Sequence, residues 1–179
     1  IDYAALYSCE SLESVVIPES VTNIGEYAFA SCSSLLSVKI PDNVASIGSY
    51  TFDDCSSLSS VELPKNMAYI GNNVFRGCIN LKEVVLPNGV DSIRCSSFNG
   101  CTSLGKVELG ESVCVIDSFA FYNCSSMKKI ALPNSVLRIN YAAFNGCEAL
   151  EKVDFGESLK VVDPYAFNKC SSLTAIILP

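Results

Sequence analysis

Hydrophobic residues recur along this chain with a period of 23 residues that no insertion or deletion interrupts. One unit, residues 9–29, reads Cys-x-x-Leu-x-x-Val-x-Ile-Pro-x-x-Val-x-x-Ile-Gly-x-x-Ala-Phe. Its Val15 and Ile17 are two residues apart, which is the spacing of a strand with one buried face. We therefore predict a strand at 13–17 that ends at Pro18, because proline cannot donate a ladder hydrogen bond.

Residues at the same position of successive units form columns, and two columns are nearly invariant. The cysteine column is Cys9, Cys32, Cys55, Cys78, Cys101, Cys124, Cys147 and Cys170. The phenylalanine column is Phe29, Phe52, Phe75, Phe98, Phe121, Phe144 and Phe167. Both columns are apolar, so we expect each to contribute one buried side chain per unit.

A further column predicts where each unit begins a helical turn. Its members are Gly25, Gly48, Gly71, Arg94, Asp117, Asn140 and Asp163. Gly, Asp and Asn are favoured before the first residue of a helix, and Asp163 precedes a proline at the first helical position. We predict about one helical turn at 26–31 and at the equivalent residues of the other units. Arg94 is the exception, and we expect a weaker helix start there.

A single unit cannot close its own core, whereas stacked units share one. A 23-residue period lies within the range of leucine-rich repeats. We predict an α/β repeat solenoid: a right-handed coil with a parallel β-sheet on its concave face and short helical turns on the other side. Residues 1–179 form a single domain of just under eight repeats, which we expect to be a segment of a longer array. Its last strand, at 175–178, would be an exposed edge, so end-to-end self-association is possible.

The repeated unit closely resembles the BspA-like class of leucine-rich repeats. The Ile-Gly and Ala-Phe elements, as at 24–25 and 28–29, carry the resemblance, which extends over essentially the whole chain. The chain departs from the pattern at Arg94 and, in the proline column, at Gly110 and Gly156. The resemblance implies a bacterial surface or secreted protein that acts in adhesion or host binding. It implies no catalytic residue.

Charge and composition exclude several function classes. Charged residues are 17% of the chain and the formal net charge is -7. Nucleic acids and anionic membranes require an excess of basic residues, so neither is expected as a partner. No apolar run is long enough to span a membrane. The chain has no histidine, which removes Ser-His-Asp and Cys-His pairs. We predict that the protein is not an enzyme and holds neither cofactor nor metal.

Ten cysteines in a secreted protein would ordinarily suggest disulfides. Stacked strands are close enough for such bridges. However, equivalent residues of stacked coils have parallel Cα–Cβ vectors, and each cysteine has two identical neighbours. A linear column of thiols also does not converge on a metal ion. We therefore predict that the column consists of buried, reduced thiols.

The outward residues of the predicted strands form the candidate binding face. One column contains Lys106, Lys129 and Lys152, which repel one another on adjacent strands. In the neighbouring column, Glu108 and Asp154 can partly neutralise them. Two interpretations remain open: a solvated surface of mixed charge, or a site for a small anion or an acidic peptide. The other half of the face carries Ser14, Ser37 and Ser60, which could suit a sugar or a peptide.

Tyrosines in other columns allow two interpretations as well. Tyr27, Tyr50 and Tyr165 stand one residue before the Ala-Phe pair. We expect them to pack at the edge of the core with their hydroxyls in water, and an aromatic binding strip on the convex side is the alternative. Tyr141 stands one residue earlier, so we expect it to point elsewhere.

The sequence thus favours a protein that presents a binding surface for a protein, peptide or glycan. Two alternatives are a structural spacer and a non-catalytic part of an extracellular enzyme. The expected location is secreted or at the cell surface, although residues 1–10 have neither the basic nor the apolar region of a signal peptide.

Overall fold

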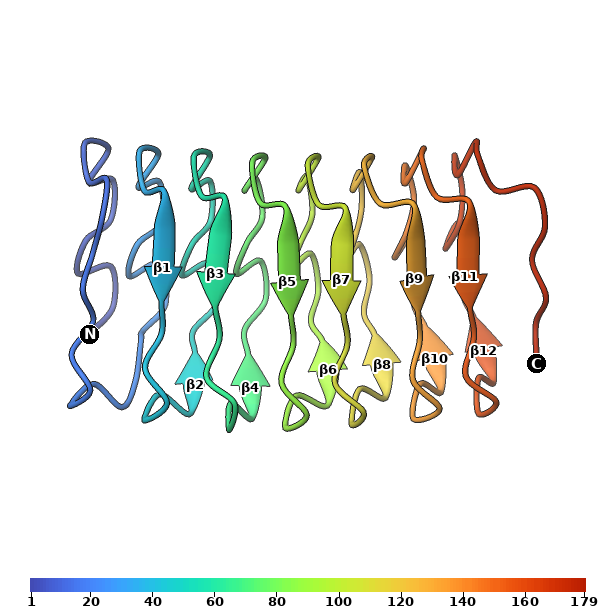
Figure 1. Ribbon diagram of the computed structural model, residues 1–179, viewed down its shortest axis with the longest axis horizontal. Helices are drawn as coiled ribbons and strands as arrows, with labels where there is room; N and C mark the ends of the chain where they lie inside the picture. The colour runs from blue at the N-terminus through green and yellow to red at the C-terminus, as the bar shows by residue number, and fades with distance from the viewer.

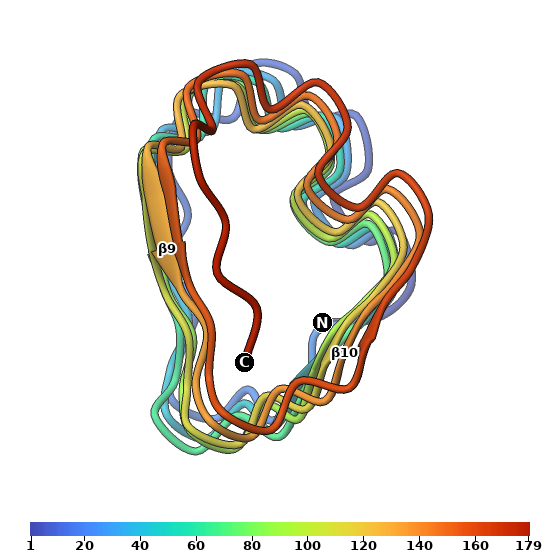
Figure 2. The same ribbon diagram turned by 90° about the vertical axis from the view of Figure 1, so that its right-hand side faces the viewer.

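The computed structural model of the protein describes all of residues 1–179. Each 23-residue unit forms one coil, and the coils stack side by side with the two termini at opposite ends (Figure 1). Viewed along the long axis, the coils lie almost over one another (Figure 2). The predicted parallel solenoid is therefore confirmed.

The strands predicted from the Val and Ile columns form one side of the solenoid, called the strand face below. They are three residues long: β1 (Ser37–Lys39), β3 (Ser60–Glu62), β5 (Glu83–Val85), β7 (Lys106–Glu108), β9 (Lys129–Ala131) and β11 (Lys152–Asp154). In the first unit only Ser14 forms a bridge, to Ser37. The central residue of each strand points into the core and its two neighbours point outward, as predicted. Val61 of β3 is the one central residue that is only partly buried.

A second row of parallel strands, which the sequence analysis did not predict, lies across the core from the strand face (Figure 2). These strands have two residues each: β2 (Ser46–Ile47), β4 (Tyr69–Ile70), β6 (Ser92–Ile93), β8 (Val115–Ile116), β10 (Arg138–Ile139) and β12 (Val161–Val162). In five of these six strands, the second residue is buried in the core. Two residues are too few to show the alternation by which a strand is recognised in a sequence.

The predicted helical turns are wrong, because the structure contains no helix in these segments. Hydrogen bonds within the coil alternate there with hydrogen bonds to the next coil. Ala30 N–H donates to Tyr27 O at 3.1 Å, whereas Phe29 N–H donates to Thr51 O at 2.9 Å. A helix directs every N–H along its own axis, so this alternation excludes one.

Left-handed residues produce the alternation. Tyr27 and Ser31 have φ angles of 57° and 59°, and the equivalent residues of the other units are also left-handed. In the second of these columns Gly77, Gly100 and Gly146 remove the steric penalty of such an angle. Gly, Asp and Asn are favoured before a helix, but the turn that follows them in this protein is not helical.

The core is one continuous cluster of 43 buried residues. Its centre is the phenylalanine column, in which neighbouring rings lie 5.2–5.6 Å apart and nearly parallel. Six of these side chains, Phe29 to Phe144, are fully buried. The cysteine and leucine columns complete the core, as predicted from their periodicity.

The C-terminal segment does not form the predicted edge strand. Residues 175–178 have no regular structure, and Ile177 is 85% exposed. Their backbone makes no hydrogen bonds to β11. No element of the structure is a helix with the length and hydrophobicity that a membrane span requires.

Replacing Phe75 by alanine tests the assignment of inward and outward columns. Phe75 is fully buried between two other rings, so Phe75→Ala should lower the free energy of unfolding by about 3–5 kcal/mol. Ser60→Ala, on the exposed side of β3, should change it by less than about 0.5 kcal/mol. Urea denaturation of the two variants measures both values. Equal losses would mean that the columns are misassigned.

Candidate ligand-binding site

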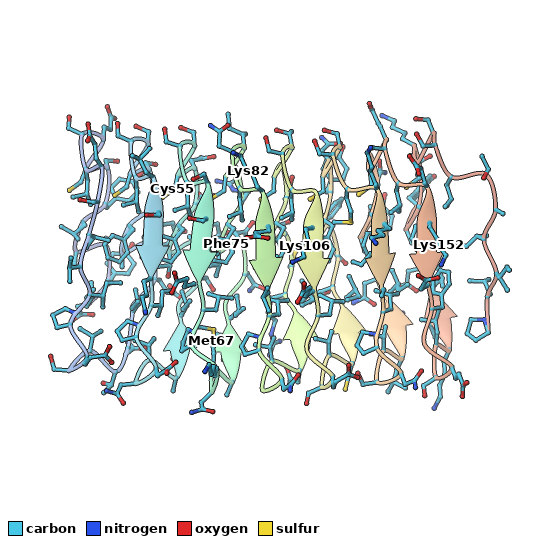
Figure 3. The ribbon with its side chains drawn as sticks, viewed as in Figure 1. Cys55, Met67, Phe75, Lys82, Lys106 and Lys152 are labelled. Atoms are coloured by element: carbon cyan, nitrogen blue, oxygen red, sulfur yellow. The ribbon has the colours of Figure 1, made fainter.

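The strand face brings the predicted site residues together. Lys106, Lys129 and Lys152 occupy the first position of β7, β9 and β11, and all three are exposed. Lys129 and Lys152 are direct partners in the register of the two strands. Figure 3 labels Lys106 and Lys152 on their strands, at the same level of the face.

The expected neutralisation by neighbouring carboxylates is present for two of the three lysines. Lys106 Nζ lies 2.8 Å from Glu108 and 3.8 Å from Glu83, and Lys152 Nζ lies 2.6 Å from Asp154. The hydrogen bond with Glu108 raises the pKa of Lys106 above its ordinary value, so this side chain stays charged at neutral pH. Lys129 forms no ion pair.

A hollow of about 510 Å³ adjoins the unpaired lysine. It is lined by Gly105, Ser126, Lys128, Lys129, Glu151 and Lys152. Gly105 leaves it open, because the nearest atom to a Cβ built at that residue would be 3.8 Å away. The walls therefore consist largely of lysine side chains, with a positive balance of three lysines to one glutamate. We call Lys106, Lys128, Lys129 and Lys152 the lysine patch.

Lys128 is a member of this patch that the sequence analysis missed. It lies one residue before β9, where the strand pattern assigned no outward position. The adjacent pair Lys128-Lys129 was the signal that could have identified it. The serine half of the face differs, because Ser14, Ser37 and Ser60 form a row of bridged uncharged residues.

The aromatic residues form two clusters beside the left-handed turns, with no aromatic residue joining them. In the first, Tyr27 and Tyr50 are stacked at 4.7 Å, and the Arg76 guanidinium lies 5.9 Å from the Tyr50 ring. The second consists of Phe119, Tyr122, Tyr141 and Tyr165. The expectation that Tyr141 points elsewhere is wrong, because its ring lies 5.4 Å from Phe119 and 5.6 Å from Tyr165.

Seven of the eight thiols of the cysteine column, from Cys32 to Cys170, point at backbone oxygens. Each thiol from Cys55 to Cys170 lies 3.1–3.3 Å from the carbonyl oxygen of a phenylalanine 26 residues earlier. Six cysteines, from Cys32 to Cys147, are buried. Burial raises the pKa of the Cys55 thiol to about 12 and that of Cys170 to about 11. These thiols are therefore poor nucleophiles and poor metal ligands at neutral pH.

Comparisons with known proteins agree with this architecture. The sequence profile of the BspA-type leucine-rich-repeat region matches residues 1–124 and 91–179, with six copies. The chain thus belongs to the BspA-type leucine-rich-repeat family. A search of curated proteins finds no match.

Solved bacterial structures resemble the chain along most of its length. The leucine-rich-repeat protein of Treponema pallidum is 32% identical, with a TM-score of 0.83 over 90% of this chain and 78% of that one. One from Bacteroides ovatus is 28% identical, with a TM-score of 0.59 over 96% of this chain. A leucine-rich cell surface protein from Faecalibacterium prausnitzii is 30% identical, with a TM-score of 0.58 over 82% of this chain. The chain spans 56% of the B. ovatus protein and 47% of the F. prausnitzii protein.

Thiol titration tests the burial and the redox state of the cysteine column. In native buffer the six buried thiols should not react with a disulfide reagent, and denaturant should expose nearly all ten cysteines. Because the folded pKa is raised, the neutral thiol stabilises the fold, and this contribution is lost as pH rises above the ordinary pKa of 9.0 towards the folded values. The melting temperature should therefore fall above about pH 9. Mass spectrometry without reductant that finds four disulfides within the column would contradict this account.

Proposed function

We propose that this protein is a non-catalytic binding module and that the lysine patch of its strand face holds an anionic group of the ligand. The observation that carries the proposal is Lys129, an exposed lysine without an ion-pair partner at the rim of a hollow that two further lysines line. Core packing requires none of these side chains, because all of them point away from the core.

A carboxylate or a sulfate fits this site best. Lys129 and Lys152 lie side by side on paired strands, so their mutual repulsion is relieved when an anion lies between them. Glu108 and Asp154 hold the neighbouring ammonium groups in place and would set the orientation of the bound group. The ligand class is an acidic peptide, a protein loop or a sulfated or carboxylated glycan.

Several observations favour binding over catalysis. No three metal-binding side chains lie close enough to share an ion, and the thiols of the cysteine column are poor nucleophiles for the reason given above. The family consists of repeat proteins, and repeats of this kind provide extended surfaces for partners. A location at the bacterial cell surface is part of the proposal, and the similarity to a leucine-rich cell surface protein supports it.

A structural spacer is the second candidate. The coils stack with little change of direction (Figure 2), which suits a rod that displays another domain. The lysine patch is what separates the two candidates, since a spacer needs only a solvated surface.

Fluorescence anisotropy with a labelled hexaglutamate peptide tests the binding site. The triple variant Lys106→Ser, Lys129→Ser, Lys152→Ser should weaken binding about tenfold, which corresponds to about 1.4 kcal/mol, and should keep its melting temperature. Binding to the unmodified protein should weaken as salt rises, because the charges are exposed.

The control variant Lys39→Ser, Lys65→Ser, Lys160→Ser removes the same charge at exposed residues outside the patch, and its affinity should stay close to that of the unmodified protein. If the two triple variants bind the peptide equally, net charge alone governs the interaction and the proposed site is wrong.

A further inference from the structure

Both rows of strands are interrupted at the same place. On the strand face, β1 pairs with β3 and β5 pairs with β7, but no ladder joins β3 to β5. In the second row, β2 pairs with β4 and β6 pairs with β8, but no ladder joins β4 to β6. Figure 1 shows the wider gaps at both places. The strand face has one further interruption, between β7 and β9, where the second row remains paired.

Missing hydrogen bonds mark this junction in detail. Gly71 N–H donates to Ile47 O at 3.0 Å and Asp117 N–H donates to Ile93 O at 2.8 Å, but Arg94 N–H makes no such bond to Ile70. On the strand face, Ile40 N–H donates to Glu62 O and Leu86 N–H to Glu108 O, and Leu63 N–H lacks the equivalent bond to Val85. The two coils therefore lack ladder hydrogen bonds along both rows of strands.

The third side of the coil remains closed at the junction. Asn73, Phe75 and Gly77 donate backbone hydrogen bonds of 2.8–2.9 Å to residues 95, 97 and 99 of the next coil. The rings of Phe75 and Phe98 are tilted by 15°, whereas the other neighbouring pairs of the phenylalanine column differ by 1–9°. The coils thus diverge from a closed turn side towards open strands, as a wedge does.

The wedge coincides with a change in the glycine column. A Cβ built at Gly48 or Gly71 would lie 2.4–2.5 Å from backbone atoms of the preceding coil, so the first coils approach more closely than a side chain permits. Arg94 is the first residue of this column with a Cβ. A Cβ alone does not open a junction, because Asp117 also carries one and keeps its bond to Ile93. Arg94 differs in its long side chain, whose guanidinium lies over the Tyr69 ring at 5.2 Å. This departure from the repeat pattern therefore lies at the junction where both rows of strands open.

The wedge opens a cleft of about 680 Å³ on the strand face, the β3–β5 cleft. Its residues are Val61, Glu62, Leu63, Lys65, Glu83, Val84, Val85, Leu86, Pro87 and Asn88. Val61 and Leu63 are partly exposed in it, although the equivalent residues of the two adjacent coils are buried. The floor of the cleft is therefore aliphatic core surface, and the carboxylates of Glu62 and Glu83 lie at its rim.

The walls of the cleft also present backbone groups without partners. Glu62 directs its carbonyl to β1, so the next residue, Leu63, directs its N–H to the other side, towards the cleft. Leu86 directs its N–H to β7, so Val85 directs its N–H and C=O towards β3. Cα atoms of β3 and β5 remain within 8 Å of each other, whereas a strand inserted between them would need two spacings of about 4.8 Å. The gap between the strands therefore has room for a side chain and not for a peptide main chain.

We propose that the β3–β5 cleft binds an extended peptide that inserts an aliphatic side chain between the two strands and carries a basic residue beside it. The aliphatic side chain covers Val61 and Leu63, and the peptide main chain lies over the outer surface of the two strands. The basic residue pairs with Glu62 and Glu83, whose present ion pairs, with Lys39 and Lys106, are long at 3.6 and 3.8 Å. This site adjoins the lysine patch through the ion pair of Glu83 with Lys106, but it recognises the opposite charge.

Titration of ¹⁵N-labelled protein with the peptide Ser-Lys-Leu-Lys-Ser, blocked at both ends, tests the proposal. Saturable shifts should concentrate on the amides of Val61, Leu63 and Val85. Ser-Lys-Ser-Lys-Ser and Ser-Glu-Leu-Glu-Ser each lack one of the two recognised features, so each should bind at least about tenfold more weakly. Equal binding of all three peptides would overturn the proposal.

A pair of variants tests whether the peptide binds in the β3–β5 cleft. Val85→Lys puts a charge and a longer side chain at the mouth of the cleft and should weaken binding of Ser-Lys-Leu-Lys-Ser about tenfold. Val85 is 53% exposed, so the melting temperature should not change. Val16→Lys makes the same change in the same column, far from the cleft, and should leave affinity unchanged. Equal affinity of the two variants for the peptide would contradict the proposal. Amide shifts at the cleft on titration with the oligosaccharide cellohexaose, together with none on titration with the peptide, would contradict it as well.

Discussion

Backbone hydrogen bonds between neighbouring coils are the interaction on which this structure depends. Within a coil the left-handed turns use only every second N–H, and the others, such as that of Phe75, bond to the next coil. Each residue must therefore lie beside its own equivalent, which is why the 23-residue period permits no insertion. The same register stacks phenylalanine on phenylalanine and aims each cysteine thiol at a carbonyl of the preceding coil. The constant repeat length thus determines the backbone hydrogen bonds, the stacking in the core and the columns of residues on the surface.

The periodicity was sufficient to predict the solenoid, its inward columns and the strand face, because burial repeats with the sequence. It was not sufficient for the turns. Gly, Asp and Asn favour a helix start, but the left-handed residues that prevent a helix lie two and six positions later, as at Tyr27 and Ser31. Tyrosine and serine give no signal of a left-handed conformation in the sequence. The predicted edge strand at 175–178 did not form, and the backbone of this segment makes no hydrogen bonds to β11.

The candidate sites were predictable to different degrees. Lys106, Lys129 and Lys152 follow from strand alternation alone, whereas Lys128 and the hollow beside Gly105 depend on how neighbouring side chains pack. The β3–β5 cleft depends on a distance between coils that no single repeat specifies. Arg94 was visible in the sequence as a departure from the repeat, but the pairing of the strands was needed to see that two coils open at this departure. Irregularities in a regular array thus locate both proposed sites.

Amide hydrogen exchange, measured residue by residue in the native protein, tests the central claim most directly. The claim is that bonds between coils hold the fold and that both rows of strands open at one junction. Phe75 and Gly77, which bond to the next coil, should be protected close to the free energy of global unfolding. Leu63 and Arg94, whose equivalent bonds are missing, should exchange much faster than Leu86 and Asp117 in the same columns. Protection of Leu63 and Arg94 equal to that of Leu86 and Asp117 would contradict the account.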